Sequence, residues 1–393
     1  MSGNTAEKLG FRTSYSNLFR DLRLVLVIFL GILLRIILLV YGVDYEGDAE
    51  IYARRGREVL EGFIPYKDYV ETKPPLWIAS VVAWFYITTY KSFNSIKSML
   101  IIADIFFLIG ALYLIHKGIN REKYDPLIFL ILIALNPMII VNSAYYGRYD
   151  IIPAAFAFSA FFFLRYKKEK VSALMLGIAT MYKYLAAVFL PPLLISIKTN
   201  VKRIEYILIF SSLCLLILIP VYFIASIDRF IEDTYYYFSE RGARGLGLWK
   251  LASRLEIINT STSSIPFIVQ AICLVIVTIF MVSKKSSFIN EEVWIEFFII
   301  VFFVTYLLSN KIILMQYFIF YLPFLAFITS RNEINMTTKK LVYILNFITF
   351  ILIILKREYI DNTFFLTLGI IGVYLTTIIP LMLIYKLLIK TKI

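Results

Sequence analysis

Long apolar runs, separated by short charged stretches, recur along almost the whole of this 393-residue chain. Hydrophobic residues make up 60% of the sequence. Ordinary globular domains hold roughly 45–50%, so the excess must face something other than water. We expect an all-α polytopic membrane protein, in which 1–393 form a single bundle of about twelve transmembrane helices (11–13). The expected spans are 23–42, 98–115, 126–142, 151–164, 171–184, 185–197, 204–226, 263–283, 292–308, 312–330, 341–355 and 362–389.

The charged residues between these runs orient the spans. The net charge is +13, which in a soluble protein would indicate binding to nucleic acid. Here the positive-inside rule accounts for the excess, because every loop on one side is basic when 1–22 is placed in the cytoplasm. Both termini are then cytoplasmic, and no nucleic acid partner is expected. The external side carries 43–97, 143–150, 227–262, 309–311 and 356–361.

This topology requires that 76–90 does not cross the membrane. At 15 residues the segment is short for a span, which needs about 20. If it crossed, the basic loops on the two sides of 126–142 would exchange faces. We therefore expect an interfacial or re-entrant helix within the first external loop, 43–97.

The first external loop begins with Glu46-Gly47-Asp48. Two carboxylates at this spacing, at a membrane face, suit a general base or a hard divalent cation. The structural alternative is that Asp48 caps the helix that follows it. That segment predicts an amphipathic interfacial helix. Its apolar face is expected to hold Ile51, Tyr52, Val59 and Phe63, and its polar face the i,i+4 pairs Glu50–Arg54 and Arg57–Glu61.

The same loop ends with Lys73-Pro74-Pro75. The two prolines stiffen the chain and exclude a helix before them, so Lys73 stands at the entrance of a rigid turn. A lysine on the external side runs against the positive-inside bias. Phosphate binding is one explanation, and extension of the side chain to the membrane interface is the other.

Further ionisable residues lie in or beside the apolar runs. Asp150 is in the short external stretch AYYGRYD, where it is either functional or a helix cap. Charged groups inside a membrane are costly and usually face a bundle interior or a wet cavity, which applies to Arg35, Lys183 and Asp104. Arg35, Lys183 and Lys311 stand near the external ends of their runs. Together with Lys73 they could form a positive pocket for a lipid phosphate, opposite the carboxylates.

The stretch GDAEIYARRGREVLEGFIPYKDYVETKPPL closely resembles the first external loop of GT-C membrane glycosyltransferases, in the pattern of the protein O-mannosyltransferase and lipid A aminoarabinose transferase group. The shared features are an opening acid, a helix containing tyrosine, a G-x-x-Pro-Tyr turn and Lys-Pro-Pro-Leu. GIATMYKYLAAVFLPP (177–192) also looks like this family. SNKIILMQYFIFYLPFL (309–325) is similar to a segment of the GPI mannosyltransferases.

The resemblance implies a GT-C type bundle, with amphipathic juxtamembrane helices in the first external loop, that uses a polyprenyl-phosphate sugar on the extracytoplasmic side. It implies that Asp48 is the base, that Lys73 and Lys183 contact the lipid phosphate, and that Asp150 is the second external acid. Tyr66 falls in the Pro-Tyr turn and is expected to bind substrate. The chain departs from many relatives at Ala49, where they have a second acid. Glu46 precedes instead.

We expect an inverting glycosyltransferase, in which the acceptor hydroxyl is activated by Asp48 and the leaving phosphate is stabilised by Lys73, Lys183, Arg244 and Lys311. The acceptor is a glycan, lipid or protein. Glu46 and Asp48 could hold Mg²⁺ or Mn²⁺, whereas a single histidine, His116, excludes a His-rich metal site. The plasma membrane of a prokaryote, or the endoplasmic reticulum of a eukaryote, is the expected location. The alternatives are a transporter or flippase of a lipid-linked or anionic solute, and a non-catalytic subunit.

Overall fold

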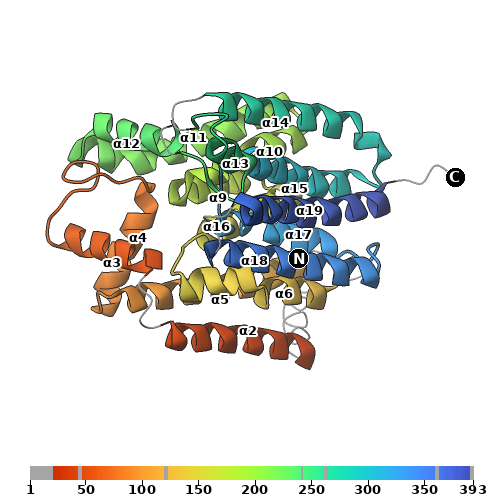
Figure 1. Ribbon diagram of the computed structural model, residues 1–393, viewed down its shortest axis with the longest axis horizontal. Coiled ribbons are helices and arrows are strands. Elements are labelled where there is room, and N and C mark those ends of the chain that lie inside the picture. Colours follow the sequence, from red (N-terminus) through yellow and green to blue (C-terminus); the bar gives the residue numbers. More distant parts are fainter. Residues whose placement is uncertain are drawn as a thin grey trace, which may run out of the picture.

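The computed structural model describes residues 21–42, 47–118, 123–239, 242–260, 264–358 and 363–389, most of them helical. The elements are α2 (Leu22–Tyr41), α3 (Gly47–Leu60), α4 (Pro75–Thr88), α5 (Phe93–Gly118), α6 (Pro126–Ala134), α7 (Pro137–Ile140), the π-helix η1 (Val141–Tyr145), α8 (Ile151–Arg165), α9 (Glu169–Tyr182), the 3₁₀-helix η2 (Tyr184–Phe189), α10 (Leu190–Ser196), α11 (Asn200–Ile224), α12 (Ile227–Ser239), β1 (Arg244–Gly245), α13 (Leu248–Arg254), α14 (Ile265–Ser283), the 3₁₀-helix η3 (Lys285–Ser287), α15 (Glu291–Ser309), β2 (Ile312–Ile313), α16 (Met315–Phe318), α17 (Leu322–Thr329), α18 (Met336–Glu358) and α19 (Thr363–Leu388). The long helices run side by side, and α3, α4 and α12 gather at one end of the bundle (Figure 1).

The all-α membrane fold is confirmed. Seven helices of the described chain are long and apolar enough to cross a membrane: α2, α5, α11, α14, α15, α18 and α19. An eighth expected span, 126–142, is a pair of helices bent by 43°. The other four expected spans contain shorter helices, and two of these spans, 185–197 and 312–330, are interrupted rather than continuous.

The bend in the third expected span has a local cause. Asn136 accepts a hydrogen bond from the Met138 N–H (3.0 Å) and so caps α7. Pro137 follows and has no N–H for the helix ladder, so α6 ends before it. The chain then continues as the π-helix η1, which leads directly into the turn 146–150.

The buried guanidinium of Arg35 stabilises this bend from α2. It donates hydrogen bonds to the carbonyls of Gly31 and Ala134 (both 2.9 Å), and Ala134 is the last residue of α6. Its Nε also donates to the Asp104 carboxylate (2.9 Å), and both side chains are fully buried. Asp104 accepts a further bond from the Ser143 hydroxyl in η1. The pair therefore connects four elements of the bundle: α2, α5, α6 and η1.

The expectation that 76–90 forms a short helix agrees with α4, and that this helix does not cross the membrane stays a prediction. Its 14 residues are about 21 Å long, against a hydrocarbon thickness of about 30 Å. α4 packs against α3 through Gly56, where a Cβ would come within 2.6 Å of Val81.

The expected apolar face of α3 was wrong in part. Ile51 and Phe63 are exposed, and small residues take the buried face with Tyr52: Ala49, Ala53 and Gly56. Glu50 pairs with Arg57 (2.6 Å) rather than with Arg54. Small residues allow close approach of the backbones, which decides helix faces in a membrane more than hydrophobicity does.

A charged cluster marks the opposite end of the bundle. The buried Glu296 of α15 accepts hydrogen bonds from Tyr124 (2.7 Å), Arg331 (2.9 Å) and Arg165. These residues stand at the start of α6, the end of α17 and the end of α8, so alternate helix ends meet there, as the expected topology requires.

Candidate active site

A cavity of about 560 Å³ lies at the end of the bundle where α3 packs. Six charged side chains from six separate stretches line it, and five of them are cations: Asp48, Lys73, Arg148, Lys183, Arg244 and Lys311. All of these except Arg148 were expected at the site, and the structure brings them together. A single carboxylate facing this much positive charge suits an anionic ligand beside a general base.

Asp48 is fixed by the turn that follows η1. The Nε of Arg148 donates to its Oδ2 at 2.6 Å, and the Asp48 N–H donates to the Tyr146 carbonyl at 3.2 Å. Burial alone would lower the pKa of Arg148, but the adjacent Asp48 outweighs it and raises that pKa above its ordinary value. Arg148 therefore stays charged beside the carboxylate.

The contact between Ala49 and Gly147 explains why this chain lacks a second acid after Asp48. Ala49 is fully buried, and a Cβ on Gly147 would come within 2.4 Å of the Ala49 Cβ. Gly147 also has φ +63°, which glycine adopts without strain. An acidic side chain at 49 would have to displace the turn that carries Arg148.

Asp150 and Lys183 form a buried ion pair at the edge of the cavity. Lys183 lines the cavity, whereas Asp150 is not among its lining residues and accepts the Lys183 ammonium hydrogen bond. Asp150 occupies the cap position of α8 but makes no side-chain cap bond, so its carboxylate serves the lysine instead. The ammonium also lies 5.0 Å from the ring centre of Tyr317 and 5.5 Å from that of Tyr149.

Lys73 is held by its own turn. Its N–H donates to the buried Glu71 carboxylate (2.9 Å), and its Nζ lies 3.7 Å from the same group. The Glu71 N–H in turn donates to Asp233 of α12 (2.9 Å). Pro74 is extended at the start of α4, as the diproline predicts.

Tyr66 supports this turn from outside the cavity, so the structure does not place it as a substrate contact. Its hydroxyl donates to the Lys73 carbonyl, and its ring packs edge-on against Phe230 of α12. Its φ is +60°, in the left-handed region that a bulky residue rarely adopts. The tyrosine therefore positions the backbone of Lys73.

Arg244 and Lys311 are joined by the short pair β1–β2. The Arg244 N–H donates to the Lys311 carbonyl (3.1 Å). Gly245 is required there, because a Cβ would lie 1.6 Å from the Ile313 carbonyl oxygen. Burial lowers the pKa of the Lys311 ammonium.

Besides Asp150 and Tyr66, one more predicted site residue of the described chain does not line the cavity. The structure places Arg35 away from it, fully buried against Asp104, so its assignment as a substrate-binding residue was wrong. Glu46 lies outside the described residues. The described residues contain no group of three or more His, Cys, Asp or Glu side chains arranged to hold a metal. Arg148 binds one of the two oxygens of the Asp48 carboxylate, and the Mg²⁺ or Mn²⁺ site expected at Glu46 and Asp48 stays a prediction.

The sequence interpretation passed over Arg148 and three carboxamides that line the cavity: Gln270, Asn310 and Gln316. Arg148 follows a glycine in a short external loop, a position typical of a residue presented to a site. The carboxamides carry no local signal, because each belongs to an otherwise apolar helix end.

The chain is similar to known proteins in sequence and in fold. Over 298 residues the chain is 23% identical to GPI mannosyltransferase 1 of Candida albicans. The matched stretch is 68% of this chain and 73% of that relative. The fold of the present chain is similar to that of ArnT from Cupriavidus metallidurans, which was solved in the apo state and bound to undecaprenyl phosphate. Each match has a TM-score of 0.51 and 12% identity, over 92% of this chain and 77% of ArnT.

Residues 72–309, which run from the Lys73 turn to the end of α15, match the model of glycosyltransferase family 87. This range includes four of the five cations that line the cavity: Lys73, Arg148, Lys183 and Arg244. A match over more than half of the chain identifies the family: the protein belongs to glycosyltransferase family 87.

Proposed function

We propose that this membrane glycosyltransferase moves a sugar from a polyprenyl-phosphate donor to an acceptor hydroxyl, with inversion at the anomeric carbon. The observation that carries the proposal is the convergence of one carboxylate and five cations in a single cavity. The relatives support it, because one is named a mannosyltransferase and one solved structure holds undecaprenyl phosphate.

In this mechanism Asp48 removes the proton of the acceptor hydroxyl as that oxygen attacks C1 of the sugar. The new O–C1 bond forms while the bond from C1 to the phosphate oxygen breaks, and the phosphate leaves with the electron pair. Lys73, Lys183 and Lys311 stabilise the charge that develops on it, as preorganised cations do. Arg148 orients the Asp48 carboxylate through a charge-assisted hydrogen bond.

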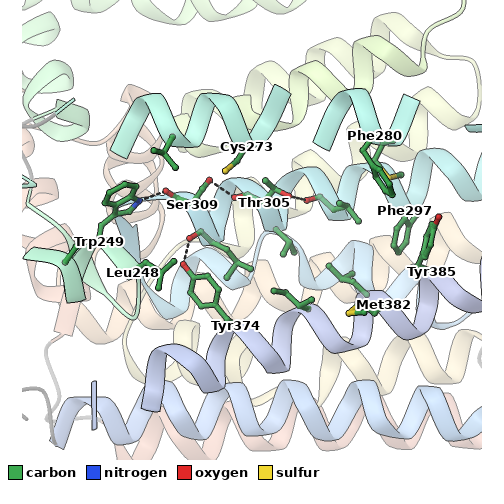
Figure 2. Close-up of a pocket in the computed structure, with 18 residues that line it drawn as sticks. Leu248, Trp249, Cys273, Phe280, Phe297, Thr305, Ser309, Tyr374, Met382 and Tyr385 are labelled. Carbon is green, nitrogen blue, oxygen red and sulfur yellow. Dashed lines mark hydrogen bonds between the residues drawn. The ribbon is translucent and has the colours of Figure 1, made fainter. Parts of the chain in front are cut away.

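An apolar groove beside the cavity supplies a place for the lipid chain of the donor (Figure 2). Its volume is about 660 Å³, and its lining comes from α13, α14, α15 and α19. It shares two helices with the cavity: Gln270 and Cys273 of α14 lie one turn apart, the first in the cavity and the second in the groove. Trp249 and Leu248 stand at one end of the groove and Tyr385 at the other (Figure 2). We assign it to the polyprenyl chain because it continues from the wall that holds Lys311 and Arg244.

The cavity faces the extracytoplasmic side in this proposal, and both termini are cytoplasmic. The support is the basic character of every loop at the opposite end, where Arg165 and Arg331 surround Glu296.

The test is transfer in proteoliposomes from a panel of polyprenyl-phosphate sugars, with products identified by mass spectrometry. Asp48→Asn is expected to lower the transfer rate roughly 10²–10⁴-fold, the usual contribution of a general base. The matched control is Glu61→Gln, the same change at an exposed acid just beyond α3, which should retain the wild-type rate. Full activity of Asp48→Asn would refute the assignment. Solute flux without any glycosylated product would favour a transporter.

A further inference from the structure

One wall of the cavity is built from neutral amides rather than charges. Gln270 of α14, Asn310 at the end of α15 and Gln316 of α16 all line it. A carboxamide offers both an acceptor oxygen and two N–H donors but carries no net charge. This wall therefore differs in chemistry from the five cations that suit a phosphate.

Two of the three amides are already committed to the protein. The Nε2 of Gln270 donates to the Tyr306 carbonyl (2.9 Å), and the Oδ1 of Asn310 accepts from the Ile312 N–H (2.8 Å). These bonds connect α14 to α15 and α15 to β2.

Gln316 is different. Its Oε1 is buried and has no hydrogen-bond partner among the residues that the structure describes. Leaving a buried acceptor unpaired costs about 1–3 kcal/mol, so such an oxygen in a ligand cavity indicates a missing donor. The ligand is the group that remains to supply it.

The position of Gln316 shows which part of a ligand that donor belongs to. The next residue, Tyr317, lies with its ring centre 5.0 Å from the Lys183 ammonium, and Lys311 is five residues earlier. Gln316 therefore lines the same cavity as the cations assigned to the phosphate and is close in sequence to Lys311. A phosphodiester has no O–H to donate at neutral pH, and a polyprenyl chain has none at all. The hydroxyls of the sugar and of the acceptor are the donors that remain, and the sugar is the one bonded directly to the phosphate.

We propose that Gln316 is a specificity-determining residue, whose Oε1 accepts a hydrogen bond from one hydroxyl of the sugar on the donor. This inference rests on the proposed function and adds the side chain that recognises the sugar. A site built to bond a hydroxyl strongly rejects an analogue that lacks it, because the buried partner is left unpaired.

The experiment measures kcat/KM for a polyprenyl-phosphate hexose and its four analogues that lack the hydroxyl at C2, C3, C4 or C6. Gln316→Met keeps the length of the side chain and removes the acceptor. For the complete donor it should lower kcat/KM roughly 5- to 150-fold, the equivalent of 1–3 kcal/mol. For the deoxy donor that lacks the recognised hydroxyl, the kcat/KM of the wild type should already be lower by this factor. Gln316→Met should lower that value little further.

Two controls separate recognition from structure. Gln270→Met changes an amide that is already bonded to Tyr306, and its loss should be the same factor for every donor. Binding of polyprenyl phosphate without a sugar should be equal in the wild type and Gln316→Met, which a misfolded variant would not satisfy.

Equal loss by Gln316→Met on all five donors, or no loss on any, would overturn the inference and leave the proposed function standing. No transfer by the wild type from any polyprenyl-phosphate sugar would overturn both.

Discussion

Replacing Asp150 by asparagine removes the counter-charge of a lysine that the bundle buries. The side chains of Lys183 and Asp150 are 9% and 2% exposed, so solvent cannot replace the lost partner. Breaking a buried ion pair by removing one partner typically lowers the free energy of unfolding by about 3–5 kcal/mol. Lys183→Met should have an effect of the same size, because it leaves the carboxylate unpaired. The double variant Asp150→Asn/Lys183→Met removes both charges and should lie close to the wild type.

Asp150→Asn and Lys183→Met should differ in activity although they are equally destabilised. Lys183 lines the cavity, so its loss should lower kcat roughly 10²–10³-fold, as for one donor to a developing oxyanion. The double variant should be as slow as Lys183→Met alone although it is more stable. Asp150→Asn keeps the ammonium and should lose less activity than either. Undecaprenyl phosphate should stabilise Asp150→Asn more than the wild type, because the phosphate replaces the missing charge.

The measurement is denaturant unfolding in mixed micelles, with and without undecaprenyl phosphate, together with transfer rates in proteoliposomes. Equal stability of the wild type and both single variants would show that the pair contributes nothing. Recovery of activity in the double variant would show that Lys183 acts through the fold and not on the phosphate.

Three further predictions concern the rest of the site. Arg148→Gln should lower kcat/KM roughly 10- to 100-fold, because a hydrogen bond to a charged group contributes about 1.5–3 kcal/mol; unchanged steady-state kinetics would contradict this. Because burial lowers the pKa of Lys311, its charge is present below that pKa and is lost as the pH rises through it, so the KM for the donor should rise before pH reaches the ordinary lysine value of about 10.4. Lys311→Arg should move this rise to higher pH, and an identical KM profile would refute the assignment. Cys273→Trp fills the groove of Figure 2 and should raise the KM of a long-chain donor more than that of a short-chain analogue; equal changes would place the lipid chain elsewhere.

The helix pattern and most of the cavity could be predicted from the sequence, since both depend on local signals. Apolar runs and basic loops define the spans and their order without knowledge of any contact. Lys73 and Lys311 could be predicted because a charged residue on a loop expected to be external, or at the end of a span, is too costly to place in the hydrocarbon. Their convergence follows from the shared end of the bundle.

Partners far apart in the chain could not be predicted. Arg35 was expected at the cavity because the sequence shows its position near one end of an apolar run. Its partner Asp104 lies 69 residues away, and nothing in the sequence connects the two. Arg148 was missed for the same reason, since Asp48 is 100 residues distant. The face of α3 was mistaken at Ile51 because lipid and protein core are equally apolar, so hydrophobicity cannot tell one from the other.

The contact of Ala49 with Gly147 has a consequence for how this enzyme can change. Asp48, the proposed base, and Arg148 are 100 residues apart in the chain, yet the close approach of Ala49 to Gly147 and the hydrogen bond from the Asp48 N–H to the Tyr146 carbonyl tie their two segments together. A substitution that moves one segment should therefore move the other. In the proposed mechanism, variation in the sugar or the lipid would fall on the walls formed by α14, α15 and α16, while the geometry of proton removal stays constant.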